Sequence, residues 1–301
     1  MIISASRRTD IPSYYSEWFF RRISEGTVMV RNPMNFHQVS NISISPDTVE
    51  CIILWTKNPL PMLGRLDELD AYTYYFQFTL TPYCKNIEPN VPPKDEMVNA
   101  FTRLSEMIGK ERVIWRYDPV LINDAYDFEY HVRAFGDLAD RLCDHTEKVT
   151  VSFVDERYRG VRNNTGKLSL SAVSDETKKE LLSHFADTAH DHGLMIDACA
   201  DKADLRELGI GRASCIDDRL ISKLTGRCLN AAKDKNQRAE CGCVSSVDIG
   251  AYNTCGNGCL YCYANYNVNT VAANRKRHDP RSPLICGNIE EGDTMYERKA
   301  V

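Results

Sequence analysis

The chain has 301 residues, 43% of them hydrophobic and 26% charged, which is the composition of an ordinary soluble protein with room for one large domain. Its net charge of -5 gives no general attraction to nucleic acid or to anionic membranes, so nucleic acid is not an expected ligand. No apolar run approaches the roughly 20 residues that span a bilayer, and the N-terminus MIISASRRTD lacks the regions of a signal peptide, so we expect a cytoplasmic protein without a membrane partner.

Short apolar runs alternate with amphipathic segments along the first two thirds of the chain. Gly26 and Gly109 end two predicted helices, and Ser174 and Gly193 bracket another, because serine caps helix N-termini and glycine terminates helices. We expect strands at 1–6, 49–56, 72–81, 112–119, 147–155 and 194–200, and helices at 14–26, 94–109, 126–144 and 174–193. This alternation predicts parallel strands with right-handed crossovers, in a barrel or an open doubly wound sheet.

The strand patterns favour a barrel, complete or partial, with a polar interior. Alternation places Ser4, Gln77 and Arg116 on one face of their strands, while the opposite faces are apolar. A closed barrel normally fills its interior with branched apolar side chains, so a polar interior indicates space for a polar ligand. We therefore predict an α/β fold with a TIM-like parallel (β/α) barrel or partial barrel over residues 1–200. A cysteine-rich segment over residues 201–301 is expected to pack on the barrel mouth as part of one structural unit.

Most of the twelve cysteines lie between Cys199 and Cys262. In a chain without a secretion signal they favour thiols and metal ligands over a disulfide framework. Cys255, Cys259 and Cys262 are spaced so that three thiolates on one loop could converge on a soft metal centre, and three is one ligand too few for a structural zinc ion. The spacing therefore predicts an iron-sulfur cluster with one iron open to a ligand that is not protein. A structural zinc or redox site is the alternative.

The stretch TCGNGCLYCYANYN around these three cysteines closely resembles the cluster loop of the radical S-adenosylmethionine (SAM) superfamily, with Tyr261 as the aromatic residue before the third cysteine. Together with SASRRTDIP, WTKNP, WRYDP and KDKNQRAECGCVSSVDIGAYNTC, it resembles, nearly end to end, a family of radical-SAM-like proteins catalogued as domain of unknown function 1848. The superfamily usually carries this loop near its N-terminus, whereas here it lies in the last fifth of the chain. The fold could therefore be a circularly permuted partial barrel, or a complete barrel followed by a cysteine subdomain.

The resemblance implies a 4Fe-4S cluster held by Cys255, Cys259 and Cys262, with S-adenosyl-L-methionine on the open iron. It further implies that an electron, from a donor such as flavodoxin or ferredoxin, cleaves SAM to methionine and a 5'-deoxyadenosyl radical that acts on an unknown small-molecule substrate. The competing interpretation is a non-catalytic module in which Cys241, Cys243, Cys259 and Cys262 hold zinc and the barrel binds a ligand.

A second group of four cysteines is a further candidate metal site. Cys199 ends the sixth predicted strand, where parallel barrels place their ligands, and Cys241 and Cys243 lie just upstream of the cluster loop. With Cys215 they could hold a second iron-sulfur cluster or a zinc ion. The alternative is that some of them are small buried residues, as free cysteine often is.

Polar residues follow several of the predicted strands, and the carboxyl ends of parallel strands meet at one mouth. Arginine there can hold a carboxylate or phosphate in a bidentate fork. The alternative for Arg116 and Asp118 is a structural ion pair, because a buried charge must be paired. The candidates are Arg116, Asp118 and Lys57 for catalysis, and Tyr261, Arg8, Arg7 and Asp10 for cofactor binding.

Overall fold

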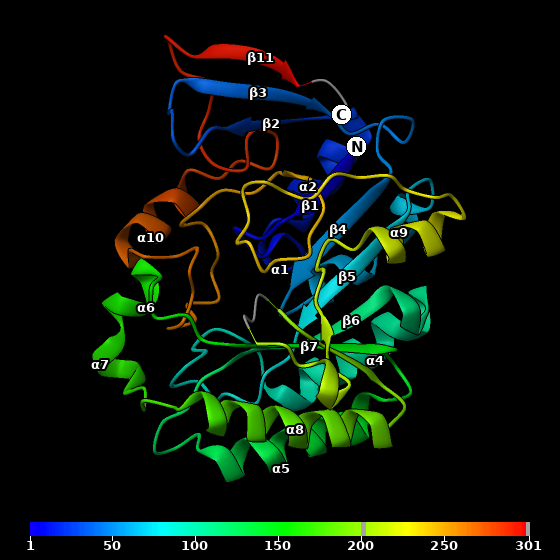
Figure 1. Ribbon diagram of the computed structural model, residues 1–301. Helices are drawn as coiled ribbons and strands as arrows, with labels where there is room; N and C mark the ends of the chain where they lie inside the picture. Colours follow the sequence, from blue (N-terminus) through cyan, green and yellow to red (C-terminus); the bar gives the residue numbers. More distant parts are fainter. Residues whose placement is uncertain (200–202, 299–301) are drawn as a thin grey trace.

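A computed structural model describes residues 1–199 and 203–298 and shows a curved parallel sheet flanked by helices (Figure 1). The strands of this sheet run in the order β10-β1-β4-β5-β6-β7-β8-β9, and all of their pairings are parallel. In the described residues no pairing joins the two end strands, β9 and β10. The bounds are β1 Ile2–Ala5, β4 Cys51–Thr56, β5 Tyr74–Thr79, β6 Val113–Val120, β7 Lys148–Phe153, β8 Met195–Ala198, β9 Gly211–Arg212 and β10 Val247–Asp248.

The predicted alternation of strands and helices is confirmed. The Ser174 hydroxyl accepts a hydrogen bond from the Thr177 backbone N–H at 3.1 Å and begins α8, and Gly26 ends α2 in the left-handed conformation. The first predicted helix is divided, because Tyr15 has a non-helical backbone between α1 and α2. The helices are α1 Ile11–Tyr14, α2 Ser16–Glu25, α3 Leu60–Leu63, α4 Lys94–Ile108, α5 Phe128–Leu142, α6 Arg159–Asn163, α7 Thr165–Leu168, α8 Asp175–Asp191, α9 Asp218–Thr225 and α10 Val268–Lys276, with 3-10 turns at Leu66–Leu69, Lys110–Arg112 and Arg206–Leu208.

A second, smaller sheet was not predicted. Its strands β2 Thr27–Arg31 and β3 Gln38–Ser43 form an antiparallel pair, and β11 Thr294–Arg298 adds in parallel to β3. The last predicted strand, 194–200, ends at Ala198 as β8, and its final residue, Ala200, lies outside the described residues. In each of the two sheets, a strand from the C-terminal part of the chain pairs with one from the N-terminal part: β10 with β1, and β11 with β3.

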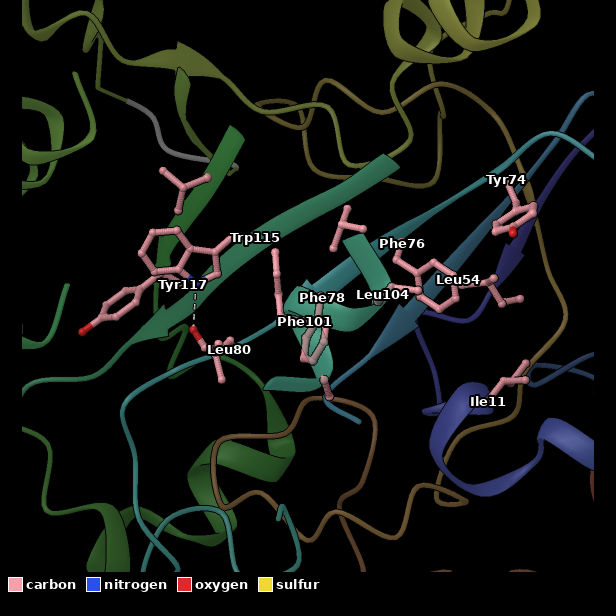
Figure 2. Close-up of a cluster of buried hydrophobic side chains, with 14 of the residues drawn as sticks. Ile11, Leu54, Tyr74, Phe76, Phe78, Leu80, Phe101, Leu104, Trp115 and Tyr117 are labelled. Carbon is pink, nitrogen blue, oxygen red and sulfur yellow. Dashed lines mark hydrogen bonds between the residues drawn. The ribbon is translucent and has the colours of Figure 1, made fainter. Parts of the chain in front are cut away.

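The outer face of the parallel sheet forms the main hydrophobic core. Helices α5 and α8 pack side by side over it, and the Trp115 and Phe135 rings stack with centroids 5.0 Å apart. Trp115 Nε1 donates to the Leu80 carbonyl at 2.9 Å, which satisfies the only polar atom of this side chain (Figure 2). Among the described helices, none is long and apolar enough to cross a membrane.

The inner face of the sheet is divided along the strands. Gln77, Arg116 and Thr150 are buried polar residues, as the alternation predicted. Nearer the amino ends of the strands, however, the inner face is apolar, and a cluster of buried side chains around Ile53 and Ile216 fills it. The polar region is therefore limited to the carboxyl ends of the strands, where the candidate site residues lie.

Candidate metal centre

The cysteine loop, residues 249–267, joins β10 to α10 and lies against the loops that follow the parallel strands. Tyr15 donates its hydroxyl to the Thr254 carbonyl at 2.6 Å, and Asn90 Nδ2 donates to the Gly256 carbonyl at 2.8 Å. Because Tyr15 follows β1 and Asn90 follows β5, the carboxyl end of the sheet positions the loop.

Asp10 connects the segments that follow β1 and β4 to the cysteine loop. Its carboxylate accepts hydrogen bonds from Thr56 Oγ1 at 2.8 Å, from the Lys57 backbone N–H at 2.8 Å and from Asn257 Nδ2 at 3.0 Å. Burial raises the pKa of Asp10, while these donors oppose the change. Asp10 was predicted to bind cofactor, and the structure gives it a fully hydrogen-bonded position between β1, β4 and the cysteine loop.

The three cysteines of the loop are buried or half-buried. Burial raises the pKa of all three, and that of Cys255 reaches about 12 because the Asp10 carboxylate adds to the effect. Backbone N–H groups oppose this rise at Cys255 and Cys262 by hydrogen bonding to their sulfurs, and Lys57 opposes it at Cys259 and Cys262. The sulfurs thus share one buried environment that contains donors and a cation.

No three histidine, cysteine, aspartate or glutamate side chains of the described residues converge tightly enough to hold a single metal ion. This finding means that neither cysteine group encloses a single ion with the side chains as they lie. It does not oppose a cluster, because each cysteine of a cluster binds a different iron and the sulfurs therefore stand apart.

A buried ionic network lies beside Cys259. Lys57 Nζ donates to Glu88 at 2.8 Å, Thr81 Oγ1 donates to the same carboxylate at 2.7 Å, and the Tyr261 hydroxyl donates to it as well. Lys57 also lies 5.5 Å from the centre of the Tyr261 ring. Lys57 and Tyr261, predicted in different roles, are therefore held together by one carboxylate that the sequence did not indicate.

Asp248, at the end of β10, fastens the cysteine loop to β1. It accepts hydrogen bonds from Ser4 Oγ at 3.0 Å, from Ser6 Oγ at 2.6 Å and from the Arg7 backbone N–H at 2.8 Å. The Arg7 guanidinium pairs with Asp234 and Asp248, and the Arg8 guanidinium with Asp248 and the Tyr252 ring. Arg7 and Arg8, predicted to bind cofactor, thus lie at the junction of β1 and β10.

Helix α6 packs closely against the backbone of the cysteine loop at Gly160. A Cβ atom on Gly160 would overlap the carbonyl oxygen of Cys262 and lie 2.8 Å from that of Asn265. Only glycine permits this approach of the two backbones.

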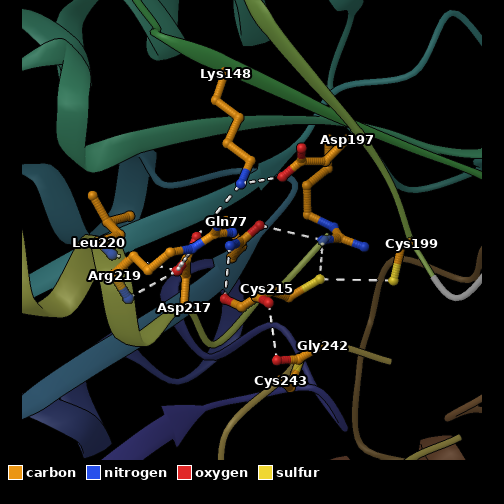
Figure 3. A network of polar contacts seen from close by, with 12 residues as sticks. Gln77, Lys148, Asp197, Cys199, Cys215, Asp217, Arg219, Leu220, Gly242 and Cys243 are labelled. Carbon is orange, nitrogen blue, oxygen red and sulfur yellow. Dashed lines mark hydrogen bonds and ion pairs between the residues drawn. The ribbon is translucent and has the colours of Figure 1, made fainter. Parts of the chain in front are cut away.

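The four cysteines of the second group lie together, in segments that connect helices and strands. The sulfurs of Cys199 and Cys215 are 3.8 Å apart (Figure 3), and the Cys243 thiol lies within hydrogen-bonding reach of the Cys215 and Cys241 sulfurs. The neighbouring Cys199 and Cys243 thiols lower the pKa of Cys215, and the Cys243 thiol also lowers the pKa of Cys241, to about 6. Cys241 and Cys243 therefore belong with Cys215, which disfavours the zinc set that combines them with Cys259 and Cys262.

Arg116 is buried on the inner face of the sheet. Its guanidinium pairs with Asp118, contacts the Cys215 sulfur at 2.7 Å and donates to Gln77 Oε1 at 3.3 Å. Ser152 donates to the same Asp118. Arg116 and Asp118 thus form the ion pair that was expected as the alternative to a catalytic role. Arg116 also faces the second cysteine group.

Glu88, Asp248 and Asn257 are the residues of the site that sequence reasoning missed. Asn257 lies between the first two cysteines of the loop, so its position could have drawn notice. Glu88 and Asp248 carry no signal of this kind, because single acidic residues in loops usually face water.

A family model with the description "Domain of unknown function (DUF1848)" matches residues 2–264. The match includes all seven cysteines of the two groups. No curated protein matches the chain.

Proposed function

We propose that this chain, which belongs to the DUF1848 family, is a radical-SAM-type enzyme. Cys255, Cys259 and Cys262 would hold three irons of a 4Fe-4S cluster and leave the fourth to S-adenosylmethionine. When bound, the cluster would supply one electron, received from flavodoxin or ferredoxin, that divides SAM into methionine and a 5'-deoxyadenosyl radical able to take a hydrogen atom from a small-molecule substrate.

The observation that carries the proposal is the set of donors at the cysteine loop. Three cysteines on one loop share a buried environment with backbone N–H groups and the Lys57 ammonium. Soft thiolates select iron-sulfur centres, and hydrogen bonds to their sulfurs tune such centres. Because the loop supplies three thiolates and not four, the residues present fit a cluster with one open iron better than a structural zinc ion.

The residues around the loop have separate tasks in this proposal. Lys57 offsets the negative charge of the thiolates, and Glu88 holds Lys57 in place. Arg7 has one buried guanidinium nitrogen, Nη1, that finds no hydrogen-bond partner among the described residues, so it can donate to an anionic group such as the carboxylate of the methionyl moiety. Arg116 and Asp118 would orient the substrate from the inner face of the sheet.

The position of β10 supports the permuted arrangement. This strand directly precedes the cysteine loop and pairs in parallel with β1, with Ile3 opposite Val247 and Ser4 opposite Asp248. In this proposal β10 corresponds to the strand that the superfamily places first, and it lies at the edge of the same sheet although it comes late in the chain.

Anaerobic reconstitution with iron and sulfide tests the proposal. The protein should take up a cluster and, once reduced, cleave SAM slowly to methionine and 5'-deoxyadenosine without its substrate. Changing Cys255, Cys259 and Cys262 together to alanine should abolish both, whereas Cys143→Ala, at the end of α5, should retain both.

A fully loaded, reducible cluster that neither binds nor cleaves SAM would refute the enzyme. A colourless protein with zinc at the cysteine loop would instead support the binding module.

A further inference from the structure

The second cysteine group is a separate feature of the molecule. Cys199 follows β8, Cys215 lies between β9 and α9, and Cys241 and Cys243 lie in the segment before β10. Cys215, Cys241 and Cys243 are between 2 and 6% exposed, and Cys199 is half-buried. We propose that these four thiolates bind one structural zinc ion, independently of the cysteine loop.

The separation between neighbouring sulfurs favours a single ion. Four thiolates about 2.3 Å from a tetrahedral zinc lie about 3.8 Å from one another. The Cys199 and Cys215 sulfurs are 3.8 Å apart, and Cys243 contacts both Cys215 and Cys241. A cluster of four irons would hold its cysteines farther apart, because each binds a different iron.

In the structure each of the four sulfurs contacts the next one in a row. Among the described residues, no three ligands surround a common position for a metal ion. A thiol without a metal bonds to its neighbour, which draws the sulfurs into such a chain. Rotation of the side chains about their Cα–Cβ bonds would close the chain around an ion while the backbones stay in place.

Two of the backbone segments that carry these cysteines are in direct contact. A Cβ atom on Gly242 would overlap Ser214 Oγ and lie 2.9 Å from the Ala213 carbonyl oxygen, so the Cys241–Cys243 turn touches the segment that carries Cys215. The Ser214 hydroxyl donates to the Gly242 carbonyl at 2.9 Å. The two segments that supply three of the four thiolates are thus in direct contact.

The surroundings provide what a thiolate-bound zinc requires. The Ile216 backbone N–H lies 3.5 Å from the Cys243 sulfur and donates to it, and Arg116 lies 2.7 Å from the Cys215 sulfur. Zinc with four thiolates has a net charge of -2, and the Arg116 and Arg7 guanidinium groups interact favourably with these sulfurs.

A metal here would have a structural purpose. Between α9 and β10, residues 226–246 form no helix and no strand beyond one isolated bridge, yet they cover the apolar part of the inner face. A zinc ion would tie this irregular segment to the ends of β8 and β9, as structural zinc does in small domains.

Metal analysis of the full chain tests the inference. Protein purified without oxygen should contain one zinc per chain, and the variant with Cys255, Cys259 and Cys262 changed to serine should keep it. The Cys241→Ser/Cys243→Ser variant should lose the zinc while its cysteine loop still takes up iron. Replacement of zinc by cobalt in the unmodified protein should give the visible absorption of tetrahedral thiolate ligation, which needs no variant to fold.

Several outcomes would overturn the inference. They are a protein that binds iron at the cysteine loop but no zinc, a loss of iron in the Cys241→Ser/Cys243→Ser variant, or a Cys199–Cys215 disulfide in protein kept under reducing conditions. Because zinc and iron are counted separately, failure of the zinc site and failure of the SAM enzyme are distinguishable.

Discussion

Replacing Glu88 by glutamine probes the ionic network beside the cysteine loop. Glu88 is 1% exposed and accepts hydrogen bonds from Lys57, Lys94, Thr81 and Tyr261. Glutamine keeps the size of the side chain but removes its charge, so the Lys57 and Lys94 ammonium groups would lose the carboxylate that pairs with both. Breaking a buried ion pair in this way costs about 3–5 kcal/mol, and we expect the free energy of unfolding of the metal-free protein to fall by that amount.

The pH dependence gives a second measure of the same interaction. Burial alone would raise the pKa of Glu88, but Lys57 and Lys94 outweigh it and lower the pKa to about 2, from an ordinary value near 4.5. The ionised carboxylate therefore stabilises the fold by about 3 kcal/mol. This contribution is complete above pH 4.5 and is lost as the pH falls towards 2. Glu88 and Cys259 also raise the pKa of Lys57 against the effect of burial, whereas burial lowers that of Lys94, so Lys57 is the better stabilised partner.

Urea unfolding of the metal-free protein, followed by circular dichroism, measures both effects. The difference between wild type and Glu88→Gln should be largest at neutral pH and should shrink between pH 4.5 and 2. In a Lys57→Met background the same substitution should cost less, because one of the unpaired charges is gone. A decrease in the free energy of unfolding of less than about 1 kcal/mol, or an equal decrease in the wild-type and Lys57→Met backgrounds, would refute the reasoning.

Two further substitutions examine the packing of the cysteine loop and the role of the inner arginine. Gly160→Ala should lower the free energy of unfolding by about 2 kcal/mol and reduce iron uptake, because its Cβ would overlap the Cys262 carbonyl, whereas Gly166→Ala has open space and should do neither. Equal stability of the two variants would show that α6 does not press on the loop. Arg116→Ala should leave the iron content unchanged and slow turnover of SAM, because we assign Arg116, with its partner Asp118, to ligand binding and not to iron. Loss of iron would instead place it among the groups that hold the cluster.

The sequence predicted those features that depend on neighbouring residues. Apolar residues recur every two residues in a strand with one buried face and every 3.6 residues in such a helix, so the main strands and helices could be recognised. Ser174 and Gly26 act on the helix ends beside them. The spacing of Cys255, Cys259 and Cys262 is also local, and it selected the loop without knowledge of the fold.

The small sheet was missed although its strands alternate. Val28, Val39 and Ile42 are fully buried, but β2 and β3 have only five and six residues, so the apolar signal is short. The strand β11 is exposed along its length and gains its conformation from pairing with β3, far away in the sequence.

Only the tertiary structure decided which loops meet. Glu88 reaches Tyr261, and Asp248 reaches Ser6, across more than half of the chain, and neither contact leaves a pattern in the sequence around it. The same is true of Cys199 and the Cys241–Cys243 turn, which come together through the segment that carries Cys215. Burial of one face is a property of a short segment, whereas the convergence of loops depends on strand order and crossovers, which arise only when the whole sheet assembles.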